Sequence, residues 1–377
     1  MKRTLSLLCL FCLLLSVPAR AEAPAVSAPS ALLMEKQTGT VLYALGEHEA
    51  REPASVTKVM TLLLVMEAID SGTLHYEDIV TPSAHASSMG GSQIWLREGE
   101  QMRVEELLKA VCVVSGNDAA VALGEHLAGS EDAFVEKMNR RAQELGMKDT
   151  HFVNCTGLPA EGHVTSAYDI ALMSRELILH HPDIRRFTTI WTDSLRDGAS
   201  MLVNTNKLIR FYPGATGLKT GSTDTAQYCL SATAERDGME LIAVVLKGAS
   251  SDERFADARA LLDYGFANYA LVTVTPDAPL APVPVRLGVQ DAVRSVLTEE
   301  NVLLLKKGDA VALSQTITLP ESVDAPVAQG ARLGELTVAD GDGNTLAVLP
   351  ILAGEDVAHV TWWQMAQRLL RCGFCAG

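Results

Sequence analysis

The stretch Glu52–Lys58 (EPASVTK) leads directly into the apolar segment Val59–Ile69 (VMTLLLVMEAI). From Ser55 onward, apolar residues occupy nearly every side of a helix, which predicts a helix buried inside a domain. On such a helix about 5–6 Å separates the Cβ atoms of Ser55 and Lys58, so the amine can reach the hydroxyl. The ordinary alternative is a first-turn serine and a solvated lysine, because chance places about one Ser-x-x-Lys in a chain of ordinary composition.

The apolar segment behind Lys58 favours a chemical role for this pair. An ammonium group that enters a buried helix loses hydration, which lowers its pKa towards neutrality. A neutral amine beside a hydroxyl can remove its proton and create a nucleophile. We therefore take Ser55 as a candidate nucleophile and Lys58 as its candidate base.

A second candidate is Ser115-Gly116-Asn117, which lies between two apolar helical patterns in VCVVSGNDAAV. Such a tripeptide is usually a turn, and Asn117 could simply start the helix that follows. Its functional interpretation is a hydroxyl and an amide presented into a cleft, where Ser115 relays a proton and Asn117 holds a substrate amide.

A third candidate is Lys219-Thr220-Gly221-Ser222, within ATGLKTGSTDTAQYCL. A lysine and two hydroxyls on one strand suit a terminal carboxylate, and Gly221 lets a ligand approach the backbone closely. The ordinary explanation is a solvated edge strand on which a lysine protects against aggregation. Chance produces such a run in about one chain in a hundred.

Residues 28–272 have the pattern of an α+β domain. Two short strands surround Thr38-Gly39, and helical patterns cover residues 104–114, 117–128, 131–145 and 167–180. After residue 200, YCLSATA and ELIAVVL form a hairpin through Asp237-Gly238, and the amphipathic helix DERFADARALLDYGFANY follows. Strands at both ends of the domain predict one sheet that the N-terminal hairpin completes, flanked by helices.

A second domain is expected because about 356 mature residues exceed what one core usually holds. Residues 271–284, rich in proline and valine, have the composition of a boundary. Residues 285–352 contain short β-type runs separated by Gly, Pro and Asp, and predict a small all-β domain.

Residues 1–21 have the form of a secretory signal peptide. Lys2 and Arg3 precede an apolar run from Leu5 to Val17, and Ala19-Arg20-Ala21 offers a small-x-small cleavage site. Removal of this segment takes away three positive charges and no negative one, so the formal net charge changes from -15 to -18. So acidic an exported chain is not expected to bind nucleic acid.

Cysteine and histidine usage indicates neither a disulfide scaffold nor a metal site. An odd number of cysteines remains after export: Cys112, Cys155, Cys229, Cys372 and Cys375. Cys372 and Cys375 have redox or metal spacing, but they form an isolated pair at the chain end. The histidines lack ligand spacing such as His-x-x-x-His.

The three candidate motifs occur in a known order: Ser-x-x-Lys, Ser-x-Asn about sixty residues later, and Lys-Thr-Gly about a hundred residues after that. In this order and spacing the chain resembles the penicillin-binding proteins and serine β-lactamases. More narrowly, it resembles the low-molecular-mass D-alanyl-D-alanine carboxypeptidases in ALLMEKQTGTVLY, HFVNCTGLPAEGHVTSAYDIA, NTNKL and ERFADARALLDYGF. One departure is Gln227, where a glycine is expected.

The resemblance implies a β-lactamase/transpeptidase-like domain over residues 28–272, with an antiparallel sheet and a helical subdomain, followed by a β-rich domain. It implies that Ser55 attacks the bond between the last two D-alanines of a peptidoglycan stem peptide, with Lys58 as base. Ser115 and Asn117 then assist, and Lys219 and Thr220 hold the terminal carboxylate. The N-H groups of Ser55 and Ser222, beside Gly221, form the oxyanion hole. β-Lactams are expected to bind covalently, and no metal or cofactor is needed.

Other functions are open at this point. A class A β-lactamase carries a Glu-x-x-x-Asn before Lys-Thr-Gly, and no such pair occurs between residues 157 and 218. An endopeptidase that cuts peptide crosslinks and a non-catalytic wall-binding protein are two further alternatives. A Ser-His-Asp arrangement with His163 and Asp169 is disfavoured, because Asp169 fits a capping box with Ser166.

Residues 357–377 predict an amphipathic helix. In HVTWWQMAQRLLRCGF, apolar residues recur at helical spacing, with paired tryptophans and arginines near the chain end. We expect this segment to anchor the exported protein on the outer face of the cytoplasmic membrane. The alternative is a helix that packs on the β domain.

Overall fold

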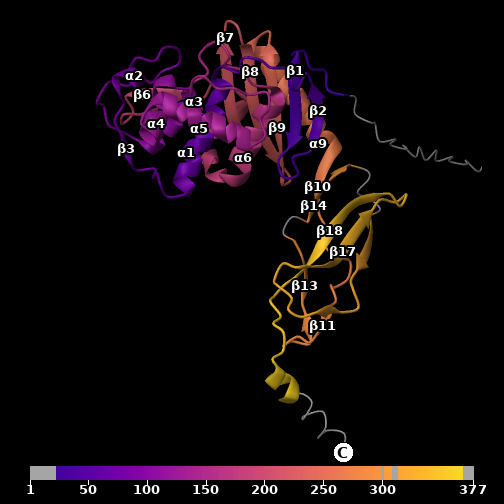
Figure 1. The fold of residues 1–377 in the computed structure, drawn as a ribbon. Coiled ribbons are helices and arrows are strands. Elements are labelled where there is room, and N and C mark those ends of the chain that lie inside the picture. Colours follow the sequence, from indigo (N-terminus) through magenta and orange to yellow (C-terminus); the bar gives the residue numbers. More distant parts are fainter. Residues whose placement is uncertain (1–22, 299–300, 308–312, 368–377) are drawn as a thin grey trace, which may run out of the picture.

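The computed structural model describes residues 23–298, 301–307 and 313–367. It contains a sheet-and-helix domain, followed by an elongated β-rich domain that extends away from one end of the sheet (Figure 1). The predicted signal peptide and the pair Cys372 and Cys375 lie outside the described residues. Cys112, Cys155 and Cys229 are buried and free.

Five antiparallel strands form the central sheet, in the order β2-β1-β9-β8-β7. The strands are β1 (Ser30–Glu35), β2 (Val41–Leu45), β7 (Ala215–Thr223), β8 (Gln227–Arg236) and β9 (Met239–Gly248). The β1–β2 hairpin pairs with β9, so the predicted completion of the sheet by the N-terminal hairpin is confirmed. Asp237 and Gly238 both have positive φ values, as the predicted tight hairpin requires.

Both faces of the sheet are buried. Because side chains alternate along a strand, Leu32 and Met34 pack into the large core with the helices that follow β2, whereas Leu33 packs into a second core with α9. The longer helices are α1 (Lys58–Asp70), α3 (Val104–Val114), α4 (Asn117–Ala128), α5 (Glu131–Glu144), α6 (Ala167–His180) and α9 (Ser251–Asn268). These bounds agree with the predicted helices to within a residue, except that α1 begins at Lys58 instead of Ser55, because residues 54–57 form a 3-10 helix.

Short elements complete the helical side of this domain. They are the 3-10 helices η1 (Ala54–Thr57) and η2 (Pro182–Ile184), the helices α2 (Ala84–Ser87), α7 (Arg185–Thr188) and α8 (Leu208–Phe211), and the strands β3 (Ile79–Val80), β4 (Met102–Arg103), β5 (Thr192–Leu195) and β6 (Ser200–Val203). β3 pairs with β4, and β5 pairs with β6. The β5–β6 hairpin packs beside α3.

The second domain is built from β-strands, as predicted. Its strands are β10 (Tyr269–Thr273), β11 (Val283–Arg286), β12 (Ala292–Val293), β13 (Ser295–Leu297), β14 (Val302–Lys306), β15 (Ser314–Thr318), β16 (Val323–Asp324), β17 (Arg332–Ala339) and β18 (Thr345–Ala353). β10 pairs with β14, so strand pairing crosses the start of the predicted boundary. The sequence pattern missed β10, β13, β14 and β16, because each is short or lacks clear alternation.

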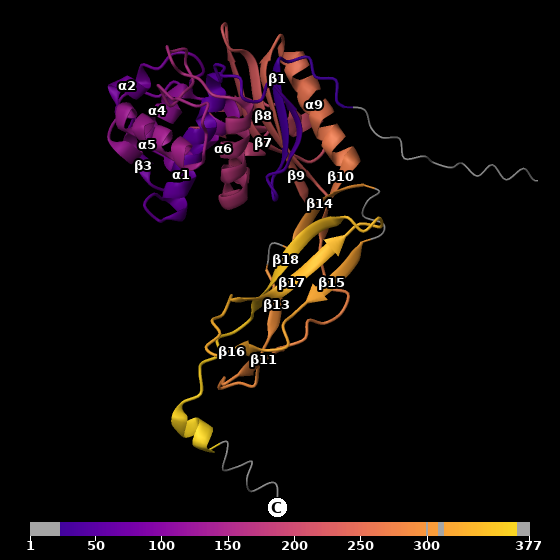
Figure 2. The same cartoon turned by 45° about the vertical axis from the view of Figure 1, so that its right-hand side comes forward.

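The C-terminal helix begins later than predicted. Val357 is buried and pairs with Val327, and His359 pairs with Gly288, so residues 357–360 extend the β domain instead of starting a helix. Residues 362–367 are helical and lie at the far end of the β domain from the sheet (Figure 2). Among the described residues, no helix has the length and apolar character needed to cross a membrane.

Candidate active site

Ser55 lies on a strained turn at the start of the buried helix. The 3-10 helix η1 carries it, and the preceding Ala54 has a φ of 48°, in the left-handed region that alanine seldom adopts. Ser55 is half-buried, and its side chain makes no capping hydrogen bond. The first-turn position is therefore as predicted, but the hydroxyl is not used to cap the helix.

The side chain of Lys58 is fully buried beside Ser55. Its Nζ lies 2.8 Å from Ser55 Oγ, 2.6 Å from Asn117 Oδ1 and 2.7 Å from the carbonyl oxygen of Thr156. Burial, and then the positive charge of Lys219, lower the pKa of Lys58 well below its ordinary value.

This geometry suits a neutral amine that acts as a base. A neutral amine has two N-H donors and one lone pair. Asn117 Oδ1 and the Thr156 carbonyl can only accept hydrogen bonds, so they take the two donors. The lone pair is then left for the remaining neighbour, which is the Ser55 hydroxyl.

Ser115 and Asn117 lie at the junction of α3 and α4. Ser115 adopts a φ of 63°, and its buried Oγ has no hydrogen-bond partner among the described residues. An unpaired buried hydroxyl costs about 1–3 kcal/mol, which is tolerated where a ligand completes the site. Gly116, not Asn117, is the N-cap, while the Asn117 amide donates to Gly90 O at 2.7 Å and keeps a second N-H. Asn117 therefore does begin α4, as the ordinary alternative expected, but its side chain does not cap the helix.

Lys219 and Thr220 lie on β7, which is an edge strand of the sheet. Lys219 is buried and donates to the backbone oxygen of Thr220 at 2.9 Å. Burial lowers the pKa of Lys219 to about 7. The Thr220 hydroxyl lies 2.7 Å from that of Thr205, a contact that the sequence reasoning did not predict although NTNKL marked the segment.

Gly221 allows β7 to pack directly on the Ser55 turn. A Cβ atom at this position would lie 2.8 Å from Ser55 N and 2.8 Å from Pro53 O. Ser222, the next residue, is exposed. Gln227, at the end of the β7–β8 turn, has a φ of 55°, so the backbone keeps the conformation that a glycine would favour there.

The loop Asn154–Leu158 supports the Ser55 turn from the other side and was not predicted to do so. Asn154 Oδ1 accepts hydrogen bonds from the N-H groups of Thr156 and Gly157, which aims the Thr156 carbonyl at Lys58. A Cβ at Gly157 would lie only 1.8 Å from Ala54 O, so this close contact requires glycine. The segment HFVNCTGLP, which resembles the carboxypeptidase family, is the sequence feature that could have indicated a role for this loop.

His163 supports the Ser55 turn through Thr57. Its Nδ1 accepts from Val153 N at 3.0 Å, so Nε2 carries the proton and donates to Thr57 Oγ1 at 2.8 Å. Thr57 in turn donates to Ala54 O at 2.9 Å. Burial lowers the pKa of His163 to about 4, so the ring is neutral at pH 7. Both ring nitrogens are engaged away from Ser55.

Asp169 does not complete a triad with His163. Its carboxylate accepts from Asp149 N and from Thr150 Oγ1, at 2.8 and 2.7 Å. The predicted capping box is half correct: Ser166 caps α6 by accepting from Asp169 N, but the Asp169 carboxylate turns to Asp149 and Thr150 instead. The hydrogen bonds of the Asp169 carboxylate to residues 149 and 150 thus take the place of the expected bond to the backbone of Ser166.

Arg254 adds a second buried cation next to β7, and the sequence reasoning gave it no role. Its Nη1 donates to the carbonyl oxygens of Gly221 and Cys229 at 3.0 and 3.1 Å. Burial lowers the pKa of Arg254 to about 10, so it is charged at pH 7. Lys219 and Arg254 together make this edge of the sheet favourable for an anion.

Comparisons with known proteins identify the family. A peptidase S11 family described as D-alanyl-D-alanine carboxypeptidase matches residues 18–250, and the C-terminal domain of penicillin-binding protein 5 matches residues 273–359. The chain belongs to the D-alanyl-D-alanine carboxypeptidase family. D-alanyl-D-alanine carboxypeptidase DacF of Bacillus subtilis (strain 168) is 44% identical over 371 residues, which cover 95% of each chain.

Solved structures of this carboxypeptidase family share the architecture. Penicillin-binding protein 5 from Haemophilus influenzae is 30% identical with a TM-score of 0.79, over 90% of this chain and 100% of that chain. Penicillin-binding protein D2 from Listeria monocytogenes in its ampicillin-bound form is 34% identical with a TM-score of 0.59, over 64% of this chain and 98% of that chain. The predicted fold class and the serine carboxypeptidase activity are confirmed.

Proposed function

We propose that the carboxypeptidase uses Ser55 to remove the terminal D-alanine from peptidoglycan stem pentapeptides. The proposal rests on one observation above all, the buried Lys58 amine 2.8 Å from Ser55 Oγ with its other two neighbours both acceptors. Ser55 Oγ attacks the carbonyl carbon of the penultimate D-alanine while its proton passes to Lys58 Nζ. The peptide C-N bond then breaks and leaves an ester on Ser55.

The leaving amine needs a proton, and Ser115 is suited to deliver it. Its unpaired buried hydroxyl can accept a proton from Lys58 as it gives its own to the departing D-alanine. Water then attacks the ester carbonyl, gives a proton to Lys58, and the returned proton restores the Ser55 hydroxyl. The second N-H of Asn117 holds the substrate amide, since the first donates to Gly90.

The terminal carboxylate is assigned to Lys219 and Thr220, with the charge of Arg254 nearby. Charge-assisted hydrogen bonds from these groups select a peptide that ends at the second D-alanine. The backbone N-H groups of Ser55 and Ser222 form the oxyanion hole. Loss of one such donor typically raises the activation free energy by about 3–4 kcal/mol. Gly221 brings the two segments together.

The test combines labelled penicillin with a free D-alanine assay on an acylated pentapeptide. We expect wild type to be labelled and to release D-alanine, and Ser55→Ala to do neither. Ser71→Ala, an exposed serine after the opposite end of the same helix, is the matched control and retains both. Labelling of Ser55→Ala would remove Ser55 as nucleophile. Rapid penicillin turnover without D-alanine release would indicate a β-lactamase, and cleavage of crosslinked dimers an endopeptidase.

Export and peripheral membrane binding complete the proposal. Residues 1–21 have signal-peptide form. The proposed substrate, the stem peptide of peptidoglycan, lies outside the cytoplasmic membrane. Trp362 and Trp363 are 81% and 66% exposed on the terminal helix, at the end of the β domain away from the sheet. Exposed paired tryptophans suit insertion at a membrane interface, which would hold the active site away from the lipid.

A further inference from the structure

Trp95 is presented to solvent by a strained turn. Its side chain is 75% exposed, although its neighbours Ile94 and Leu96 are buried. Its φ of 60° lies in the left-handed region, which is a genuine outlier for a bulky residue. Strain of this kind persists only where the surroundings enforce it, often at functional sites.

The side chains of Asp118 and Arg196 hold this turn through hydrogen bonds to its backbone. The Asp118 carboxylate, 1% exposed, accepts from the N-H groups of Ile94 and Leu96 at 3.0–3.2 Å. Arg196 donates to the carbonyl oxygens of Ile94 and Trp95, and its guanidinium pairs with Glu100 at 2.7 Å. Arg196 itself has a φ of 54°, so a second strained residue, at the tip of the β5–β6 hairpin, supports the first.

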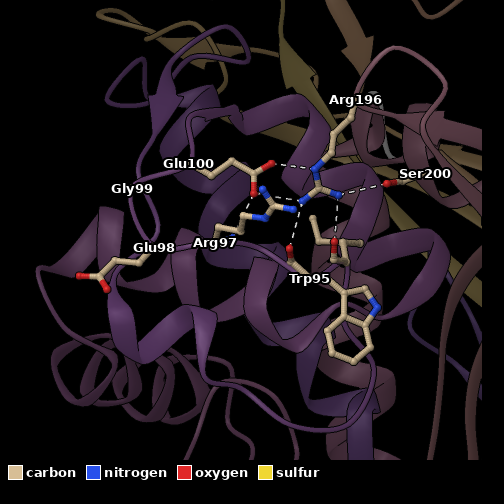
Figure 3. Close-up of a pocket in the computed structure, with 8 residues that line it drawn as sticks. Trp95, Arg97, Glu98, Gly99, Glu100, Arg196 and Ser200 are labelled. Atoms are coloured by element: carbon tan, nitrogen blue, oxygen red, sulfur yellow. Dashed lines mark hydrogen bonds and ion pairs between the residues drawn. The ribbon is translucent and has the colours of Figure 1, made fainter.

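The exposed indole borders a hollow of about 630 Å³ (Figure 3). Its lining also includes charged and hydroxyl side chains: Arg97, Glu98, Glu100, Arg196 and Ser200. A flat aromatic face beside several hydrogen-bonding groups suits a ligand that has both an apolar face and many hydroxyl or amide groups. A pyranose ring with an N-acetyl substituent has this chemistry.

The hollow lies within reach of the proposed nucleophile. Asp118 follows Asn117 directly, and Asn117 Oδ1 is 2.6 Å from Lys58 Nζ, so the Trp95 backbone lies on the order of 10 Å from the Asn117 backbone. Between the scissile carbonyl and the sugar, a stem peptide has four residues, which extend to about 13 Å. Ser55 Oγ and Asn117 Oδ1 lie 2.8 and 2.6 Å from Lys58 Nζ, so the path from Ser55 Oγ to the Trp95 backbone is at most about 20 Å. The extended peptide covers most of this path, and the sugar and the indole side chain cover the rest.

We propose that Trp95 and this hollow bind the sugar of the glycan strand to which the stem peptide is attached. This inference rests on the proposed function. The indole stacks on the C-H face of the pyranose, and the charged rim takes its hydroxyl and N-acetyl groups. The carboxypeptidase therefore prefers glycan-linked pentapeptides over free pentapeptides.

The test compares D-alanine release from a disaccharide-pentapeptide and from the same pentapeptide with a simple N-acyl group. We expect Trp95→Ala to lower kcat/KM about tenfold on the disaccharide substrate and less than twofold on the acyl peptide, with Trp95→Phe close to wild type. Val348→Ala, a change at an exposed apolar residue of β18 in the second domain, is the control and changes neither value. An equal loss on both substrates, or no loss on either, overturns the proposal.

A binding measurement keeps the proposal independent of turnover. The Ser55→Ala protein is titrated with a peptide-free tetrasaccharide of N-acetylglucosamine and N-acetylmuramic acid, and binding is followed by saturation-transfer NMR. We expect saturable binding that Trp95→Ala abolishes. If the Ser55→Ala protein with Trp95 intact does not bind the tetrasaccharide, the glycan site is overturned, even if Trp95→Ala proves unstable. Failure of the proposed function would instead appear as no D-alanine release from either substrate by wild type.

Discussion

A Cβ atom at Gly221 would lie 2.8 Å from the backbone nitrogen of Ser55, because β7 packs directly on the turn that carries Ser55. We expect Gly221→Ala to push these two segments apart by a fraction of an ångström or more. Misplacement of about 1 Å can lower a rate about a hundredfold, so penicillin acylation should fall by about that factor.

The control for this prediction is Gly238→Ala in the β8–β9 hairpin. Gly238 has a positive φ but no atom within 4 Å of an added Cβ, so this change affects backbone strain without a clash. Gly238→Ala should lower the melting temperature and leave acylation unchanged. If labelled penicillin acylates Gly221→Ala at the wild-type rate, the packing argument is wrong.

The dependence of kcat/KM on pH should be bell-shaped. Lys58 must be neutral to act as base, so the rate rises with pH through its lowered pKa. Lys219 must be charged to hold the carboxylate, and its free-enzyme pKa is about 7, so kcat/KM falls above that pH. Lys219→Arg keeps its charge, so the fall in kcat/KM should occur at a higher pH. If the fall occurs at the same pH as in wild type, it is caused by another group.

Lys219 should also destabilise the fold at neutral and acid pH. The unfolded lysine keeps its proton up to about pH 10.5 and the folded lysine only up to about 7, so wild-type stability rises with pH between these values. Below pH 7 the penalty is about 5 kcal/mol. Lys219→Met should therefore be more stable than wild type at pH 5, with the difference shrinking by pH 10 in denaturant unfolding. The same difference at both pH values would contradict the assignment.

His163→Gln should separate a supporting role from a catalytic one. Glutamine can still donate to Thr57 Oγ1, so we expect penicillin acylation to fall less than tenfold. A Ser-His-Asp mechanism instead predicts a loss of roughly 10⁴-fold or more, as for removal of a triad member. Stopped-flow acylation distinguishes the two, and Asp169→Asn provides a parallel test with the same expected small effect.

Deletion of residues 361–377 should release the protein from membranes. The cut follows Val360, because Val357 and Val360 are buried in the β domain and must stay for it to fold. Fractionation of cells that express the truncated form gives the readout, and the double variant Trp362→Ala, Trp363→Ala should show the same shift. Retention of the truncated form on membranes would place the anchor elsewhere.

The element order and most helix bounds could be predicted from local pattern. The helices 104–114 and 117–128 begin and end where the periodicity does, because burial of one face and the intervening Ser-Gly turn act over a few residues. Short strands such as β13 and β16 could not be predicted in this way, since their pairing partners lie far along the chain. The late start of the C-terminal helix depends on the same kind of pairing.

The sequence by itself determined which side chains are candidates for the chemistry: Ser55, Lys58, Ser115, Asn117 and Lys219 stand in motifs whose order is informative without coordinates. Only the tertiary structure decided their protonation and their support. The pKa of Lys58 depends on burial and on Lys219, 161 positions later, and its orientation depends on the Thr156 carbonyl. Desolvation, close packing at Gly157 and Gly221, and the presentation of Trp95 arise between distant segments, so no local pattern contains them.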